Sequence, residues 1–388
     1  MPTELKTVKK EREVWLDVAR GLCAIFVVLS HVPSTPLIYK MFYAPIMIPP
    51  FFFVSGYLSK NYNGSVGKFF YNRVLKLLIV RLIIVAELTL MSVKVIWRCL
   101  TSPSYLLNTL LDIIINTFMG HRAWFFSCLI LISVCFIIIN KLCRDKIPAM
   151  LTVSVILAAV GILVSERGTV RAWSWDTALV CQLFFVIGYC VKKKQLLSGD
   201  KIKVWHCLIS AIVYFGVEII FAVIFGAENI TITVANNDWG IIAITAVIIF
   251  TGNVFLICLA KKLPPLRFLT YIGKHSFLYF ALGGQVMLYC LQGVQILYNL
   301  TGFSPLNNIY ITCIPVTLIA CVIMLIPCWL SDKFCPALNG RINLPPLNGK
   351  NRKGSSDEKV DEHKEEAVEI STENPENKQT EVPDKKDE

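Results

Sequence analysis

The sequence has few charged residues. Asp, Glu, Lys and Arg make up 17% of its 388 residues, while 55% are hydrophobic. Soluble globular domains carry about 25% charged residues, so this composition excludes that class. Its 14 cysteines lack paired spacings such as CxxC. Because free Cys inside an apolar run behaves as a small hydrophobe, we expect neither a disulfide framework nor a metal site. The basic residues behind the net charge of +11 lie mostly in short loops. There they act as orientation signals in the membrane, which argues against a nucleic-acid partner.

What the sequence has in abundance is apolar runs of about 17 to 25 residues, the length that a helix needs to cross a bilayer. We therefore predict an all-α, polytopic integral membrane helical bundle. The transmembrane domain covers residues 14–331, between a cytoplasmic N-terminal segment 1–13 and a charged tail 349–388. The ten expected spans are about 14–33, 42–59, 77–97, 123–140, 148–164, 176–191, 204–226, 240–260, 275–298 and 309–331.

The distribution of Lys and Arg predicts the orientation of the spans. Most basic residues lie in alternate connecting segments, which places both termini in the cytoplasm. We expect the first span to be retained, because it carries Asp17 and Arg20 and lacks a small-residue cleavage site. The tail is rich in Glu and Lys and contains no Phe, Trp or Tyr, so we expect it to be disordered.

The segment from Ser104 to Gly120 is apolar but carries Asn108, Asp112 and Asn116 at a spacing of four. These three side chains share one helical face. If the segment crossed the membrane, the next basic cluster would lie outside. We therefore expect an interfacial or re-entrant helix on the outer side.

Three ionisable residues mark the first span. Arg20 and His31 are eleven residues apart, so they lie on nearly one helical face, roughly 16 Å apart along the axis. Asp17 lies one turn before Arg20 on the same side. Ionisable groups inside a membrane span are costly and indicate a functional site by default.

Five sequence blocks in a fixed order, spread over residues 14–331, resemble the membrane acyltransferase-3 family, and most of all its branch of fucose 4-O-acetylase-like proteins. They are Asp17-Val18-Ala19-Arg20-Gly21 with His31, Phe51 to Leu58, Lys68 to Lys76, His121 to Phe126, and Gly273-x-x-Ser276-x-x-Tyr279. One departure concerns Phe280 to Gly284, which contains no His. Many members have a His there, and its role has no counterpart in this chain.

The resemblance implies transfer of an acyl group, mostly acetyl, from cytoplasmic acyl-CoA to a sugar hydroxyl of a surface glycan. We therefore expect acetyl-CoA as the acyl-donor substrate, a sugar or polysaccharide acceptor, no metal, and a location in the bilayer, in a bacterial plasma membrane. Ten spans with intramembrane charges also fit a transporter for a small or anionic solute, although we see no inverted repeat. A membrane scaffold with the tail as a docking arm is a third class.

In this interpretation His31 is the general base that activates the acceptor hydroxyl. The alternative is a helix-terminal His that faces water. Arg20 would hold phosphate or pantetheine oxygens of CoA, and Asp17 would orient Arg20. The alternative for Arg20 is a structural ion pair with Asp17. Arg73 and Lys76 either clamp CoA phosphates or serve only as positive-inside charge.

The remaining candidates are assigned to substrate binding. We interpret Ser55 and Gly56 as a helix break that permits close backbone approach, with a covalent acyl-serine as the alternative. Trp124 is either a membrane-interface aromatic or a platform for a sugar. The residues expected to face the acceptor or the cavity are His121, Trp124, Ser276 and Tyr279.

Overall fold

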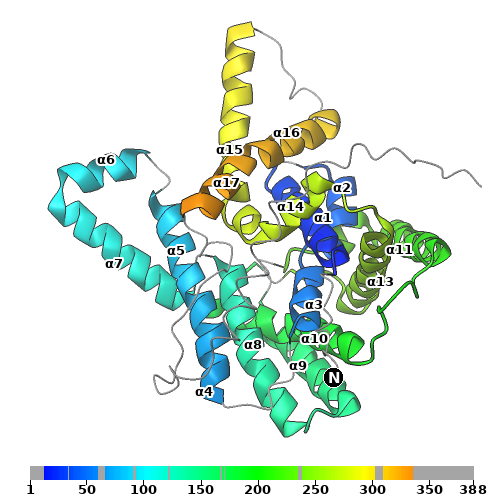
Figure 1. Ribbon diagram of the computed structural model, residues 1–388. Coiled ribbons are helices and arrows are strands. Elements are labelled where there is room, and N and C mark those ends of the chain that lie inside the picture. Colours follow the sequence, from blue (N-terminus) through cyan, green and yellow to red (C-terminus); the bar gives the residue numbers. More distant parts are fainter. Residues whose placement is uncertain are drawn as a thin grey trace, which may run out of the picture. The chain divides into compact units, whose positions relative to one another are not determined.

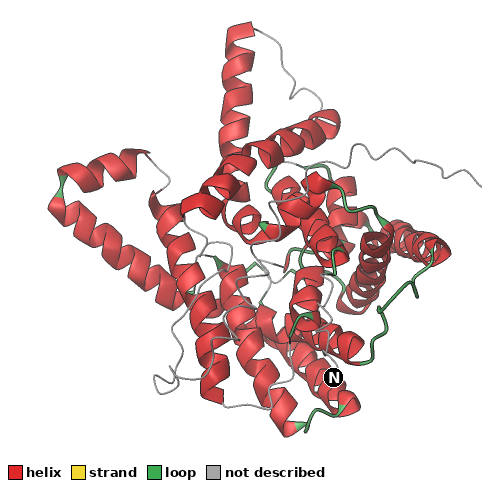
Figure 2. Cartoon of the chain, in the orientation of Figure 1, coloured by secondary structure: helices red, strands yellow, loops and turns green. Residues whose placement is uncertain are grey.

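The computed structural model describes residues 13–33, 35–59, 66–90, 93–120, 123–166, 168–169, 171–234, 238–301 and 309–334. Within these ranges the secondary structure is helical, apart from one isolated bridge between Thr233 and Asp238 (Figures 1 and 2). The predicted tail 349–388 lies outside the described residues.

The first part of the described chain runs from α1 to α8 (Figure 1). Its elements are α1 (Trp15–Ser30), α2 (Leu37–Met47), α3 (Pro49–Tyr57), α4 (Val66–Phe69), the π-helix η1 (Phe70–Leu75), α5 (Lys76–Leu90), α6 (Val93–Thr101), α7 (Pro103–Met119) and α8 (Trp124–Leu142). The second half comprises α9 (Ile147–Val164), the 3₁₀-helix η2 (Ala172–Ser174), α10 (Trp175–Lys193), α11 (Val204–Phe225), α12 (Ala227–Ile230), α13 (Ile242–Lys262), α14 (Arg267–Lys274), α15 (Ser276–Thr301), α16 (Ile309–Ile323) and α17 (Leu325–Phe334).

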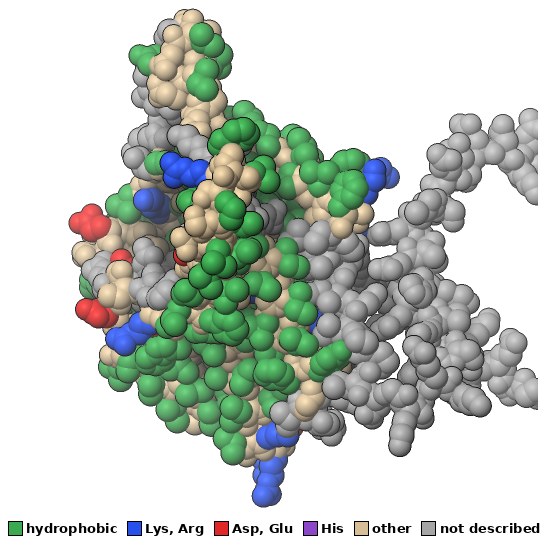
Figure 3. Space-filling view, turned by 90° about the vertical axis from the view of Figure 1, so that its left-hand side faces the viewer, with side chains coloured by type: hydrophobic (Ala, Val, Ile, Leu, Met, Phe, Trp, Pro, Cys, Tyr) green, Lys and Arg blue, Asp and Glu red, His purple; other side chains and the backbone are tan. Residues whose placement is uncertain are grey.

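Eight segments of the described chain are long and apolar enough to cross a membrane. They are Leu37–Tyr57, Trp124–Leu142, Ile147–Val164, Ala172–Lys193, Val204–Phe225, Ile242–Lys262, Ser276–Thr301 and Thr312–Phe334. The other two expected spans correspond to α1 and α5, which have 16 and 15 residues. Hydrophobic side chains cover much of the face in Figure 3, as expected for a surface that contacts lipid. The prediction of an all-α polytopic helical bundle is confirmed.

The third expected span is shorter than predicted. We expected one helix over 77–97, but α5 ends at Leu90 and α6 begins at Val93. The helix that follows, α7, has 17 residues and is not among the eight candidate spans. Its start is capped by Ser102 and its end by Gly120, which has a φ of 79°. Its position on the outer side of the membrane stays a prediction.

Close helix crossings hold the centre of the bundle together. A Cβ added to Gly56 of α3 would lie 1.9 Å from the carbonyl oxygen of Phe185 in α10. A Cβ added to Gly188 of α10 would lie 2.0 Å from the carbonyl oxygen of Phe53. The two backbones therefore touch, which only glycine allows. The predicted close approach at Gly56 is present, but the predicted helix break is wrong, since α3 continues through Gly56 to Tyr57.

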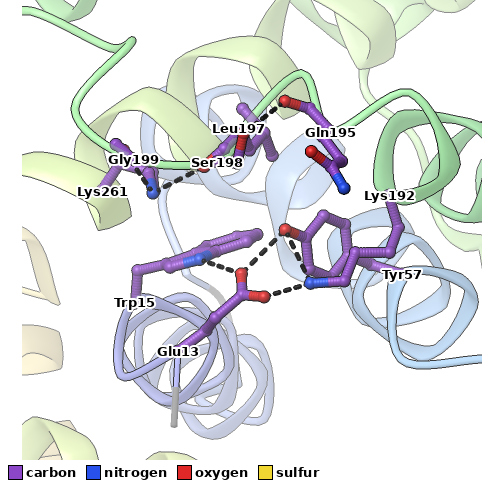
Figure 4. A network of polar contacts seen from close by, with 9 residues as sticks. All are labelled: Glu13, Trp15, Tyr57, Lys192, Gln195, Leu197, Ser198, Gly199 and Lys261. Carbon is purple, nitrogen blue, oxygen red and sulfur yellow. Dashed lines mark hydrogen bonds and ion pairs between the residues drawn. The ribbon is translucent and has the colours of Figure 1, made fainter. Parts of the chain in front are cut away.

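A polar network fixes the beginning of α1 to later parts of the chain (Figure 4). Glu13 pairs with the ammonium group of Lys192, and its Oε2 accepts hydrogen bonds from Tyr57 Oη at 2.7 Å and Trp15 Nε1 at 3.0 Å. Close by, Lys261 Nζ donates to the backbone oxygen of Leu197 at 2.8 Å, and lies 5.6 Å from the centre of the Trp15 ring. Helices α1, α3, α10 and α13 are thus joined at one end.

This network predicts a dependence of stability on pH. Burial acts to raise the pKa of Glu13, but hydrogen bonds from Lys192, Tyr57 and Trp15 outweigh it and lower the pKa. The stabilisation is therefore present above the unfolded-state pKa of about 4.3 and is lost as pH falls through the folded-state pKa. We expect Glu13→Gln to unfold more easily than wild type at neutral pH, by roughly 1 kcal/mol, with the difference narrowing in acid. Thermal unfolding in detergent at several pH values measures this, and an unchanged difference would contradict it.

Candidate active site

A cavity of about 390 Å³ opens between α1, α3, η1, α5, α8 and the start of α15. It brings together four residues that the sequence singled out and that come from three separate segments: Arg20, Ser55, Arg73 and Lys76. The other lining residues are Phe51, Val54, Leu58, Ser59, Asn72, Leu77, Val80, Phe125, Leu129 and Phe277. Three cations and no acidic side chain are among these described lining residues, so the cavity is suited to an anion.

The two arginines of the cavity make polar contacts with neighbouring residues. Arg20 Nη1 lies 3.9 Å from Asp17 Oδ1, and the Asp17 side chain is 4% exposed while that of Arg20 is 25% exposed. Asp17 is therefore placed to orient Arg20, as the spacing of three predicts. Arg73 Nη2 donates to the backbone oxygen of Ser55 at 3.4 Å, and Arg73 Nε to Ser133 Oγ at 3.4 Å.

Arg73 reaches the cavity from an irregular element. It belongs to the π-helix η1, and Lys76 begins α5 directly after it. A π-helix adds residues to a turn, so it changes which side chains face a neighbouring helix, and such turns occur frequently at functional sites. The guanidinium carbon of Arg73 also lies 5.7 Å from the centre of the Phe185 ring, which is a cation–π contact.

His31 lies away from the lining of this cavity. It follows the last residue of α1, is exposed as a whole residue, and does not belong to the lining residues. Its ring lies against α15, because a Cβ added to Gly284 would be 3.0 Å from His31 Cε1. Arg20 and His31 therefore belong to two places on one helix, roughly 16 Å apart along its axis.

Three further candidates lie outside the cavity lining. Ser276 and Tyr279 are buried, and Tyr279 Oη donates to the backbone oxygen of Cys321 in α16 at 2.8 Å. Tyr279 therefore points away from the cavity that Phe277 lines, because side chains two positions apart on a helix point about 200° apart. Trp124 packs edge-on against Phe125, with 6.2 Å between ring centres. His121 lies outside the described residues.

Sequence reasoning missed two buried groups. His275 Nε2 lies 2.8 Å from Asp332 Oδ2, and His275 Nδ1 lies 2.9 Å from the backbone oxygen of Tyr271. His275 and Asp332 are 57 positions apart in the sequence, and no local pattern indicated that they would meet. Glu218 of α11 is 1% exposed. Its signal was present, since a carboxylate inside an apolar run is itself unusual.

Comparison with known proteins assigns most of the chain to one family. The profile of the acyltransferase-3 family, described as an acyltransferase domain, matches residues 13–332. No curated protein and no solved structure matches the chain. The matched region begins at Glu13, before α1, and ends at Asp332 in α17, so it contains the whole cavity and His31. The chain therefore belongs to the acyltransferase-3 family and is a multi-pass membrane acyltransferase.

Proposed function

We propose that the protein transfers an acetyl group from cytoplasmic acetyl-CoA to a hydroxyl of a cell-surface carbohydrate, in a bacterial plasma membrane. The observation that carries the proposal is the cavity with Arg20, Arg73 and Lys76 and no acidic lining residue among those described. CoA carries phosphate groups at one end and the thioester at the other. Arginine binds phosphate through two parallel hydrogen bonds and lysine as a point charge.

In the proposed reaction His31 acts as the general base. Its imidazole takes the proton of the acceptor hydroxyl as the hydroxyl oxygen attacks the thioester carbonyl carbon. The C–S bond breaks, an ester forms, and the CoA thiolate takes up the proton from the imidazole. Because His31 follows the outer end of α1 in the predicted orientation, a carbohydrate outside the membrane reaches it there. Arg20 binds the donor, and Asp17 holds Arg20 in place.

Direct transfer fits the arrangement better than a covalent acyl-serine. Ser55 lines the cavity, but the described lining residues include no His that would activate it. A serine hydroxyl is a weak nucleophile without an adjacent base. We therefore assign Ser55 to the wall of the donor cavity.

The proposal is tested by following free CoA. The full chain in nanodiscs is supplied with acetyl-CoA, with and without a pool of carbohydrate acceptors. We expect CoA release that the acceptors stimulate, together with acetyl label in the glycan fraction. A folded protein that neither binds CoA nor releases it with any acceptor would overturn the proposal. If the same protein moves a solute across vesicles, the transporter interpretation takes its place.

The donor site gives a prediction for Lys76. Lys76→Met removes the charge but keeps the length of the side chain. We expect the KM for acetyl-CoA to rise about tenfold, because one charge-assisted contact to phosphate is lost, while kcat changes by less than about twofold. Lys333→Met is the matched control, since Lys333 is exposed in α17 and lies outside the lining. Equal KM values for Lys76→Met and wild type would remove Lys76 from the donor site.

A further inference from the structure

Three phenylalanine rings pack together at one wall of the cavity, and each comes from a different helix. We call Phe51 of α3, Phe125 of α8 and Phe280 of α15 the aromatic wall. Phe125 and Phe280 are stacked, with 4.2 Å between ring centres and 19° between ring planes. Phe51 meets Phe280 edge-on at 4.6 Å and Phe125 edge-on at 5.9 Å. Phe51 and Phe125 are each 3% exposed, while Phe280 is half-buried.

The aromatic wall lies between the donor cavity and His31. Phe51 and Phe125 line the cavity, and Phe280 packs against both of them. On α15, Phe277, Phe280 and Gly284 are spaced three and four residues apart and so share one helical face. Phe277 lines the cavity, and Gly284 contacts His31. Phe280 therefore occupies the turn between the cavity and the proposed general base.

Helix α1 runs alongside this face of α15. A Cβ added to Gly283 would lie 3.0 Å from Val28 Cγ2, one turn before His31, so this half of α1 packs against α15. The route from the donor cavity to the proposed general base runs from Arg20 to His31 along α1. Along α15 it runs from Phe277 to Gly284. A donor whose phosphates are bound near Arg20 thus meets the aromatic wall before its thioester reaches His31.

We propose that the aromatic wall selects the acyl chain of the donor, so that Phe51, Phe125 and Phe280 are specificity-determining residues. This inference rests on the proposed function. A thioester that passes between the three rings must occupy space that the rings now fill, and each added methylene requires more of that space. Phe280 is the least buried of the three. The wall therefore admits acetyl and rejects longer acyl groups.

The test compares acetyl-CoA with butyryl-CoA and uses the ratio of the two kcat/KM values. Phe280→Ala is expected to raise the butyryl-to-acetyl ratio about tenfold, since pockets discriminate by this order for one or two methylenes. Phe280→Trp is expected to lower the ratio. Phe280→Leu keeps most of the packing and is expected to raise the ratio in a variant that folds. Phe255→Ala is the control, because Phe255 is also a half-buried aromatic in a ring cluster, but it packs against Tyr214 and Phe215.

The outcomes separate this inference from the proposed function. If wild type shows no acceptor-stimulated release of CoA from acetyl-CoA, the proposed function fails. If wild type is active and the Leu and Trp variants keep the wild-type ratio, the proposed function stands and the role of the wall is refuted. A rise in the ratio for Phe255→Ala equal to that for Phe280→Leu would also refute it, because the effect would then come from general loosening of the bundle.

Discussion

Replacing His31 by alanine is expected to lower acceptor-stimulated CoA release by about 10²- to 10⁴-fold, the usual contribution of a general base. Binding of CoA is expected to stay close to wild type, because His31 does not line the cavity that holds the donor. The two measurements are the initial rate of CoA release and the equilibrium binding of CoA to the same preparation. A loss of rate without a loss of binding separates proton transfer from donor recognition.

His206→Ala is the control for this experiment. His206 lies in the first turn of α11, where its Nδ1 accepts a hydrogen bond from the backbone N–H of Lys203. It is far along the chain from Arg20 and His31. We expect its variant to keep full activity. If His31→Ala transfers acetyl at the wild-type rate, His31 is only a helix-terminal residue that faces water, the alternative given in the sequence analysis. The general base would then lie elsewhere.

Replacing Gly56 by leucine is expected to prevent the protein from folding, and Gly56→Ala to destabilise it by at least about 3 kcal/mol, at the upper end of overpacking costs. The reason is that any side chain at this position meets the backbone of Phe185, which cannot rotate away as a side chain would. Gly188→Ala is expected to have a similar effect, because its new methyl group would meet the backbone of Phe53 in the same crossing of α3 and α10. Size-exclusion profiles and thermal unfolding in detergent measure both.

Gly216→Ala provides the matched comparison. It also lies inside a membrane helix, α11, but a Cβ there meets no heavy atom within 4 Å. We expect a neutral or slightly stabilising effect, since alanine favours a helix over glycine by up to about 1 kcal/mol. Similar losses of stability for Gly56→Ala and Gly216→Ala would show that the crossing of α3 and α10 is not the cause.

The helical class and most spans could be predicted because long apolar runs leave few alternatives in a bilayer. The contact between Asp17 and Arg20 also followed from local spacing. The boundaries of α5 and α6 did not, because the apolar pattern continues across Leu90. The local sequence pattern therefore predicts contacts within one helix, but it does not predict where a long apolar run is interrupted.

Features that depend on two helices could not be read from the sequence. Most positions of a membrane helix are apolar, so the pattern of α15 does not say that Phe277 faces the cavity while Tyr279 faces α16. The meeting of Arg73 with Ser55 likewise depends on the register of η1 against α3. Each of the five blocks that carry the family resemblance contributes to the cavity lining, but the roles of individual residues within a block depend on packing.

The network around Glu13 has a consequence for the order in which the protein is completed. Lys192 is 179 residues further along the chain than Glu13, so at about 5–20 residues per second it is synthesised roughly 10–35 s later. Lys261, beside the same network, follows later still. The contacts at the start of α1, the helix that carries Arg20, therefore cannot form until α10 and α13 have been inserted into the membrane. Until then the carboxylate of Glu13 lacks the ammonium group of Lys192 with which it pairs in the folded protein.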